Sequence, residues 1–170
     1  AVGTYYSRTR EGAVHCNIMK KAEVDSLFKL VMPTHLVHCA NLTGGVPFCE
    51  KNPELAKAFH FDATIYIGEA CLKYHTKLIY ISSECVFDGE KSCYGDDADN
   101  FNPLNVYGRW KAQSELWIRK HLVDFVILRT AFVFGWQPDT VTPNALMNAY
   151  RSLQKKKPVY AAAYRAGQPT

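Results

Sequence analysis

Hydrophobic and polar positions follow two repeating patterns along the chain. Apolar residues three or four places apart predict amphipathic helices, whereas short runs that are apolar throughout predict buried strands. The helical pattern is clear at residues 23–31, where Val24, Leu27, Phe28 and Val31 are apolar. At residue 52 an Asn that can cap a helix is followed by Pro, which suits the first turn. The predicted helices are residues 23–31, 52–75, 106–122 and 142–154, and the predicted strands are residues 1–6, 34–40, 77–82, the start of 124–135, and 158–163.

The order of these segments predicts an α/β fold. Strands that alternate with helices form parallel sheets, and strands that are apolar throughout are buried on both faces. We therefore expect a parallel sheet with helices on both faces. In such sheets ligands bind beyond the carboxyl ends of the strands, so a functional site is expected at residues 7–10, 40–45, 82–89 and 129–136.

Composition and charge disfavour several classes of protein. The 170 residues are enough for one domain, 48% of them are hydrophobic, and the net charge is +4. The densest cationic run, residues 155–157, is short, and a solvated helix end explains it better than nucleic-acid binding. The six cysteines show no C-x-x-C motif and no metal-ligand spacing, which predicts no metal site and a reducing, cytoplasmic location.

Neither a membrane span nor a signal peptide is expected. No apolar run approaches the roughly 20 residues that a membrane-spanning helix needs. The sequence also has no initiating Met and starts within a predicted strand, which suggests a fragment of a longer chain.

Candidate chemistry is concentrated around residues 83–111. Ser83 follows the strand at 77–82, and Tyr107 and Lys111 lie in the first turns of the next helix. Residues four places apart share one face of a helix, so both side chains can point at one site. An ammonium lowers the pKa of a nearby tyrosine, which is ordinarily near 10, and makes it usable as a general acid–base. With a serine hydroxyl to hold a carbonyl oxygen, this set predicts interconversion of a carbonyl and an alcohol, given a hydride donor.

The Tyr-x-x-x-Lys spacing is weak evidence when taken alone. Ten tyrosines and thirteen lysines in 170 residues produce roughly one such pair by chance. The pair becomes informative because a serine ends the preceding strand and the helix starts at the same edge of the sheet.

Three segments around this pair resemble a known family. They are YISSECVFDG (80–89), NPLNVYGRWKAQSE (102–115) and ILRTAFVFG (127–135). They are similar to the extended short-chain dehydrogenase/reductases, and within them to the dTDP-4-dehydrorhamnose reductase-like group, which includes the regulatory beta subunit of methionine adenosyltransferase. The resemblance runs from residue 1 to residue 170. It implies a Rossmann-like doubly wound parallel sheet, with part of an NAD(P)-binding domain at residues 1–135 and the start of a substrate-binding lobe at residues 136–170.

The resemblance also implies ligands and partners. The expected cofactor is NADP, with NAD as the alternative, and the expected substrate is a nucleotide sugar. A second copy of the chain or a regulated protein would be the macromolecular partner. Carried over residue by residue, Ser83 would orient the keto group and Tyr107 would donate the proton. Lys111 would bind the nicotinamide ribose and tune the tyrosine.

Further residues are assigned to the cofactor by the same resemblance. Ala40 would line the cofactor, and Asn17 and Ile18 fall where the family contacts adenine. The remaining candidates are Ser7, Arg8 and Arg10, which could hold the 2′-phosphate of NADP. Two solvated loop arginines are an equally good interpretation of that segment.

The chain departs from the family pattern at its start. Nothing in it matches the glycine-rich G-x-x-G-x-x-G loop, so the first strand–helix unit is expected to be missing, and with it the helix N-terminus that binds pyrophosphate. We therefore expect these 170 residues to bind the cofactor weakly or not at all. His38 and His60 replace asparagines of the family, and we interpret them as core histidines rather than catalytic ones.

Three hypotheses on function remain open. The first is an NAD(P)H-dependent reductase of a keto-sugar nucleotide, favoured by the Ser83, Tyr107 and Lys111 set. The second is a non-catalytic regulatory or binding subunit with the same fold, favoured by the missing glycines. The third is a truncated product without independent function. A sugar-nucleotide epimerase or dehydratase ranks lower, because residues 84–106 add no further acid–base pair.

Overall fold

The computed structural model describes residues 1–91, 93–97, 99–131, 133, 135 and 144–159. The chain forms two compact units, Ala1–Arg129 and Thr130–Thr170. The first unit begins with β1 (Gly3–Tyr5), β2 (Ala13–His15), α1 (Lys21–Val31), β3 (His35–His38), α2 (Gly45–Lys51) and α3 (Pro53–Lys57). It continues with α4 (Ala63–Tyr74), β4 (Lys77–Ser83), α5 (Val106–His121) and β5 (Phe125–Thr130), whose last residue opens the second unit, which holds α6 (Ala145–Gln154).

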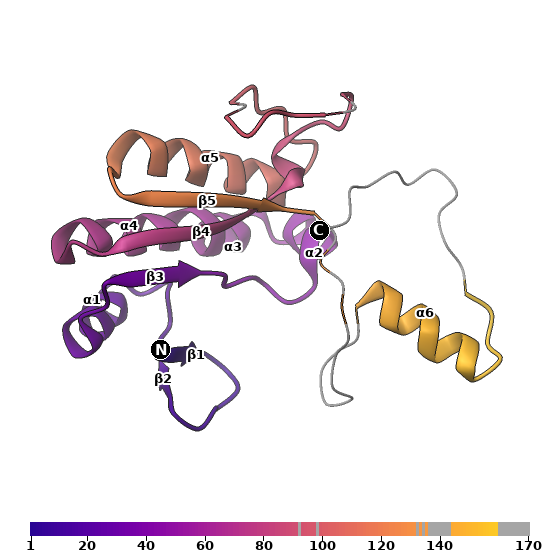
Figure 1. Cartoon of the computed structure of the whole chain (residues 1–170), viewed down its shortest axis with the longest axis horizontal. Coiled ribbons are helices and arrows are strands. Elements are labelled where there is room, and N and C mark those ends of the chain that lie inside the picture. The colour runs from indigo at the N-terminus through magenta and orange to yellow at the C-terminus, as the bar shows by residue number, and fades with distance from the viewer. Residues whose placement is uncertain (92, 98, 132, 134, 136–143, 160–170) are drawn as a thin grey trace. The chain divides into compact units, whose positions relative to one another are not determined.

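The strands form two separate sheets (Figure 1). In the first sheet β1 pairs in parallel with β2, and in the second the order is β3-β4-β5, with β3 and β4 parallel. A doubly wound sheet has the strand order 3-2-1-4-5-6. The two parallel pairs confirm the predicted α/β fold. The doubly wound order, with its first strand–helix unit missing from these residues, remains a prediction.

Most of the predicted elements are present, and two short ones were not predicted. The predicted strands at residues 1–6, 34–40, 77–82 and 124–135 correspond to β1, β3, β4 and β5. Strand β2 and helix α2 were not predicted from the sequence. Of the predicted strand at 158–163, residues 158 and 159 are not in a strand, and 160–163 lie outside the described residues.

The predicted helix at 52–75 is one helical run with a change of pitch. It consists of α3, a π-helical turn at Ala58–Asp62 and α4. Pro53 occupies the first turn as predicted, since its missing N–H has no helical partner there. Asn52 occupies the N-cap position of this helix as predicted, but its side chain makes no capping hydrogen bond and its amide instead donates to the Phe48 carbonyl in the last turn of α2.

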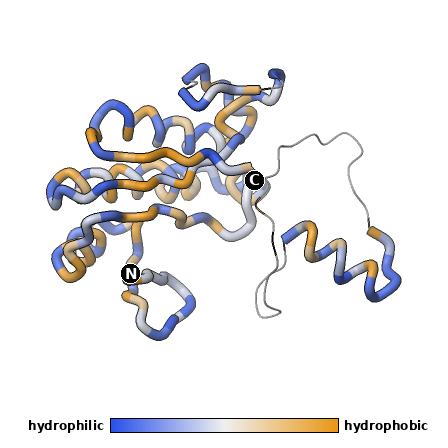
Figure 2. The backbone as a smooth tube through the Cα atoms, viewed as in Figure 1, coloured by the Kyte–Doolittle hydropathy of each residue, from blue (hydrophilic) through white to orange (hydrophobic). Residues whose placement is uncertain are grey.

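The hydrophobic core lies between one face of the β3-β4-β5 sheet and helices α1, α4 and α5, which pack side by side. Burial alternates along β4, where Leu78 and Tyr80 are fully buried while Ile79 is half-buried. Figure 2 shows that β4 and β5 are hydrophobic along most of their length, whereas α5 is mixed. The alternation follows from the strand geometry, which directs successive side chains to opposite faces.

The other face of this sheet differs from the prediction. Val37, Val126 and Leu128 are exposed by 56%, 36% and 46%. Within the described part of the first unit, the expected helices therefore cover one face and not both. A strand with apolar side chains on both faces is expected to be buried on both faces. The sequence of the strand does not show which segment packs against each face.

The second unit contains one described helix. Helix α6 starts where the Asn144 side chain accepts a hydrogen bond from the Met147 amide at 2.9 Å, which satisfies a free N–H of the first turn. The predicted helix at 142–154 thus begins at 145 among the described residues. The proposed division between residues 1–135 and 136–170 remains a prediction. None of the described helices has both the length and the apolar character that crossing a membrane requires.

Candidate functional site

The structure brings Ser83 and Tyr107 into contact. Ser83 is the last residue of β4, and its side chain accepts a hydrogen bond from the Cys85 amide at 3.2 Å, which starts a short 3₁₀ turn. Tyr107 is the second residue of α5, and its phenol lies close enough to the Ser83 hydroxyl for the two groups to interact. The predicted meeting of strand end and helix start is thus present. We call Ser83, Tyr107 and Lys111 the candidate site.

Local sequence explains why α5 starts at this place. The Asn105 side chain caps the helix by accepting from the Gly108 amide at 2.7 Å. Gly108 lies directly against the backbone of Cys85: a Cβ at this position would stand 2.0 Å from the Cys85 carbonyl oxygen. Only a residue without a side chain allows this approach, and the approach brings Tyr107 to the end of β4.

Lys111 is buried and its ammonium is held by the sheet. Its Nζ donates to the Ile81 carbonyl at 2.8 Å and lies 4.5 Å from the Tyr80 ring centroid. The Tyr107 ring centroid is farther away, at 5.9 Å. Burial lowers the pKa of Lys111 to about 8, although the Glu115 carboxylate opposes this shift. The lysine therefore shares the helix face of the tyrosine, as predicted, but its hydrogen bond goes to the backbone of β4.

The expected effect of this lysine on the tyrosine is not seen. We expected Lys111 to lower the pKa of Tyr107, yet burial, assisted by the nearby Cys85 thiol, raises that pKa to about 12. The neighbouring Ser83 hydroxyl acts in the opposite direction on this pKa and is outweighed. The physical reason is that exclusion of water disfavours a phenolate, while the ammonium is engaged elsewhere. At neutral pH Tyr107 is therefore a protonated phenol, which can donate a proton.

Three residues of α5 at four-residue spacing contact the last three residues of β4. Tyr107 meets Ser83, Lys111 meets the Ile81 carbonyl, and Glu115 accepts from the Ser82 hydroxyl at 2.5 Å. Positions i, i+4 and i+8 lie along one face of a helix, so the whole face is aligned with the strand. The register of α5 on β4 thereby sets the geometry of the candidate site.

Two buried histidines lie beside the site. The His60 ring stands edge-on to the Tyr107 ring, with 5.0 Å between centroids, and His60 Nε2 lies 3.8 Å from the Cys49 sulfur. His38 Nε2 lies 3.2 Å from the Thr64 hydroxyl oxygen. Burial, together with the Lys111 charge, lowers the pKa of each histidine to about 3, so both rings are neutral near pH 7. Their burial and contacts fit the interpretation as core histidines.

Three of the predicted cofactor residues surround one hollow. Asn17, Ile18 and Ala40 line a hollow of about 110 Å³ together with Tyr6 and Phe59. Ligand pockets usually measure about 300–1,000 Å³, so this hollow holds at most part of a dinucleotide. A larger hollow, of about 260 Å³, lies beside Val14, His15, Glu23, Ser26, Leu27 and Leu30 and includes none of the predicted residues.

The loop between β1 and β2 presents the other cofactor candidates to solvent. Ser7, Arg8 and Arg10 are all exposed. The next loop is held by side-chain hydrogen bonds: the Asn17 backbone N–H donates to Glu23 at 2.7 Å, and the Asn17 side chain accepts from the Met19 backbone N–H at 3.1 Å. The structure thus leaves the three loop residues accessible, but it does not bring them into the hollow. Their role as cofactor ligands stays a prediction.

Metal coordination has no candidate among the described residues. No group of three or more His, Cys, Asp or Glu side chains in that part of the chain could hold a metal ion. The cysteines are all free thiols. The chemistry that the described part offers is that of the hydroxyl, phenol and ammonium of the candidate site.

Comparisons with known proteins agree with this architecture. Residues 3–170 match the family model described as RmlD substrate binding domain. Methionine adenosyltransferase 2 subunit beta from Danio rerio is 30% identical over 161 residues, which are 91% of this chain and 46% of that protein. The chain therefore spans about half the length of this curated relative.

Two solved structures show a similar fold. A hypothetical dTDP-4-dehydrorhamnose reductase from Sulfolobus tokodaii has a TM-score of 0.80 and 25% identity, covering 93% of this chain and 54% of that one. The dTDP-4-dehydrorhamnose reductase of Bacillus anthracis, solved in complex with NADP, has a TM-score of 0.74 and 23% identity, covering 88% of this chain and 54% of that one.

Proposed function

The chain belongs to the RmlD substrate binding domain family, and we propose that it is part of an NAD(P)H-dependent reductase that acts on the keto group of a nucleotide sugar. The observation that carries this proposal is the approach of the Tyr107 phenol to the Ser83 hydroxyl at the end of β4, with the Lys111 ammonium 5.9 Å from the centre of the phenol ring. A hydroxyl, a protonated phenol and a cation at one sheet edge are the groups that carbonyl reduction requires.

The proposed reaction uses each group once. The Ser83 hydroxyl donates a hydrogen bond to the keto oxygen and holds it beside the phenol. Tyr107, with its pKa raised to about 12, transfers its proton to that oxygen as the carbonyl carbon is reduced to an alcohol. The hydride that reduces the carbonyl carbon would come from a nicotinamide cofactor, if one is bound. Burial disfavours the phenolate that remains, so it takes up a proton from solvent, and Lys111 would hold the nicotinamide ribose.

The residues present suit the two ends of an NADP molecule. Arg8 and Arg10 are exposed cations beside Ser7, a set that can pair with a 2′-phosphate. Tyr107 and Lys111 would contact the nicotinamide ribose. The hollow lined by Asn17, Ile18 and Ala40 would take the adenine end.

The pyrophosphate in the middle of the cofactor has no comparable binding group among the described residues. The G-x-x-G-x-x-G pattern, whose helix N-terminus is the usual site for pyrophosphate, does not occur in the sequence; Gly44 and Gly45 open α2, but they follow the later strand β3. We accordingly expect residues 1–170 alone to bind NADPH weakly. Micromolar NADPH binding by this chain, measured by titration calorimetry, would contradict that expectation.

The test of the proposed reaction uses the full-length protein. Oxidation of NADPH is followed by absorbance with dTDP-4-dehydrorhamnose as the probe substrate. The wild type should turn over, and Y107F should lose about 10²–10⁴-fold in kcat, because general acid catalysis contributes this much. Y74F, which changes a tyrosine near the end of α4, is the matched control and should keep wild-type kcat. A full-length wild type that binds NADPH but reduces no keto-sugar nucleotide would refute the proposal.

One observation favours a second candidate, a non-catalytic regulatory subunit. The relative that covers 91% of this chain is the beta subunit of methionine adenosyltransferase 2. In this case the full-length protein would bind a methionine adenosyltransferase catalytic subunit and alter its kinetics, and Y107F would leave both properties unchanged. Co-purification of wild type and Y107F with that subunit separates the two candidates.

A further inference from the structure

Glu115 is a carboxylate enclosed where three elements meet. It lies on α5, one turn after Lys111, and its side chain is fully buried. It accepts hydrogen bonds from the Ser82 hydroxyl on β4 at 2.5 Å and from Nη2 of Arg129 on β5 at 2.8 Å. Two further contacts from Nε of Arg129, at 3.1 and 3.2 Å, make this pair multidentate. A carboxylate can be buried only where such partners replace its lost hydration. Glu115 therefore joins α5 to β4 and β5 directly behind the candidate site.

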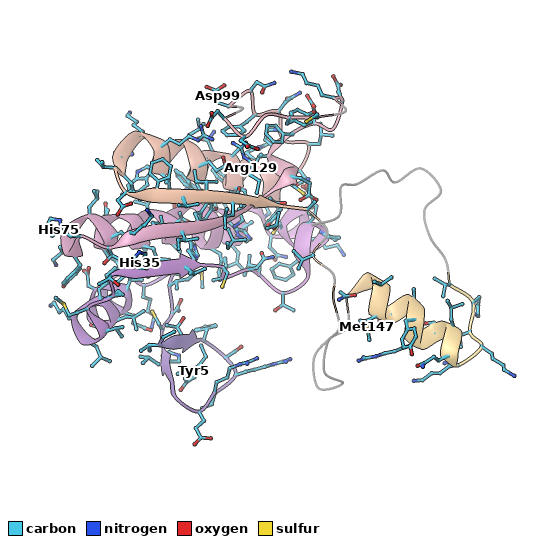
Figure 3. All side chains as sticks on the ribbon, in the orientation of Figure 1. Tyr5, His35, His75, Asp99, Arg129 and Met147 are labelled. Atoms are coloured by element: carbon cyan, nitrogen blue, oxygen red, sulfur yellow. The ribbon has the colours of Figure 1, made fainter. Side chains whose placement is uncertain are left out.

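Arg129 extends this network to the loop between β4 and α5, residues 87–105. Its guanidinium carbon lies 5.0 Å from the ring centroid of Phe87 and 5.3 Å from that of Phe101. Its Nη1 donates to the Asp96 carbonyl at 3.2 Å. Figure 3 shows Arg129 between β5 and the loop that carries Asp99. One side chain of β5 thus contacts both Glu115 and the loop.

Both ends of this loop lead into the candidate site. Ser83 lies just before it, at the end of β4, and Tyr107 follows it, at the start of α5. Arg129 contacts both the loop and Glu115, which fixes α5 against β4. A shift of the loop or of α5 would therefore change the distance between Ser83 and the Tyr107 phenol. A displacement of about 1 Å between reacting groups can reduce a rate about 100-fold.

We propose that Glu115 and Arg129 are positioning residues for the candidate site. The carboxylate holds the register of α5 against β4, and the guanidinium holds the 87–105 loop against both. Neither group touches the reacting atoms. The kinetic part of this inference rests on the proposed function, whereas its structural part rests on the contacts alone.

The test uses the full-length protein and removes the pair together. The variant E115M/R129M removes both charges of the closest pair, and Arg119, whose Nη2 lies 4.0 Å from Glu115, has a side chain that is 30% exposed, so the variant should fold. D124N removes the exposed Lys77–Asp124 ion pair at the far end of β4 as a matched control. Amide hydrogen exchange should become at least ten-fold faster at Asn102, whose N–H donates to the Val86 carbonyl across the loop. In the reductase assay kcat should fall about 100-fold, with the KM for NADPH within two-fold of wild type.

The outcomes separate this inference from the proposed function. R129K, which keeps one charged donor, should recover part of the lost kcat, and D124N should change neither measurement. Wild-type exchange at Asn102 in a folded E115M/R129M variant would overturn the inference, as would an unchanged kcat in an active enzyme. If the wild type shows no reductase activity but the double variant exchanges faster, the proposed function fails and the positioning role stands.

Discussion

Lowering the pH from 7 to 5 should destabilise the chain through its two buried histidines. His38 and His60 are only 5% and 2% exposed, and both contact groups that do not favour a charged ring. The Thr64 hydroxyl donates its one proton to the His60 carbonyl at 2.7 Å, so His38 Nε2 must carry the hydrogen that meets the threonine oxygen. Lys111 adds a positive charge near both rings. Each ring is therefore held neutral in the folded state.

The size of the effect follows from the two pKa values of each ring. Burial lowers the pKa of each histidine in the folded chain from 6.5 to about 3, whereas the unfolded chain keeps the ordinary value. Below pH 6.5 the unfolded state binds more protons, so the free energy of unfolding falls as the pH falls. At pH 5 the loss is about 2 kcal/mol for each ring and about 4 kcal/mol for both. This is a large part of the 5–15 kcal/mol that stabilises a typical domain.

Carboxylates do not produce the same dependence in this window. Hydrogen bonds, chiefly from the Asn17 amide, lower the pKa of Glu23, and the Tyr94 hydroxyl in the first place lowers that of Asp88 to about 2. The stability that they contribute is present above their unfolded values, near 4, and is lost only below them. A loss between pH 6.5 and 5 therefore reports the histidines.

The assay is urea denaturation of the chain at pH 7 and pH 5, followed by circular dichroism. H38N and H60N each place a non-titrating amide at a buried position, and each should reduce the difference between the two pH values by about half. H35N, at an exposed position on the same strand as His38, is the matched control and should keep the full difference. Equal stability of the wild type at pH 7 and pH 5 would refute the reasoning, as would a full difference in the H38N/H60N double variant.

Three further changes have defined outcomes. G108A should shift the start of α5, because its Cβ would stand 2.0 Å from the Cys85 carbonyl oxygen. We expect kcat to fall at least ten-fold. An unaltered kcat would show that the close approach of Gly108 to Cys85 is not needed. G68A should lower the free energy of unfolding by about 1–3 kcal/mol in urea titrations, because its Cβ would stand 2.3 Å from the Trp117 ring where α4 packs on α5; a stabilised variant would mean that the ring can move aside. R8A in the full-length protein should weaken NADPH binding about ten-fold, which is the effect of losing one charged hydrogen bond. NADH binding should stay unchanged, and fluorescence titrations measure both affinities. Equal effects on both cofactors would exclude a contact between Arg8 and the 2′-phosphate.

The long elements of the fold could be predicted because their patterns are local. The signals that predict α5, namely its capping residue and its apolar face, all lie within one short segment of the sequence. Strand β4 is a run of mostly apolar residues that ends at Ser83. Strand β2 has three residues, too few to show a period, and it is a strand because it pairs with β1. Helix α2 was missed for a similar reason, since its seven residues include Gly45 and Pro47.

The proximity of Ser83, Tyr107 and Lys111 could be predicted from the sequence, whereas the groups that surround them could not. The spacing of Tyr107 and Lys111 and the end of β4 were enough to place the three groups together. Nothing in the sequence indicated that His60 and Cys49, which are 47 or more positions away, lie beside the phenol. The partnership of Glu115 and Arg129 was likewise invisible, because two separate elements have to pack before those side chains meet.

By itself, the sequence determined which residues share a helix face and which residue ends a strand, since both follow from the covalent geometry of neighbouring residues. Only the tertiary structure decided the protonation of those groups. The Tyr107 phenol is neutral and the Lys111 pKa is lowered because distant segments exclude water from both, and the ammonium is directed to the Ile81 carbonyl because β4 lies beneath α5. Solvent exclusion depends on what packs around a group, and that depends on the whole fold.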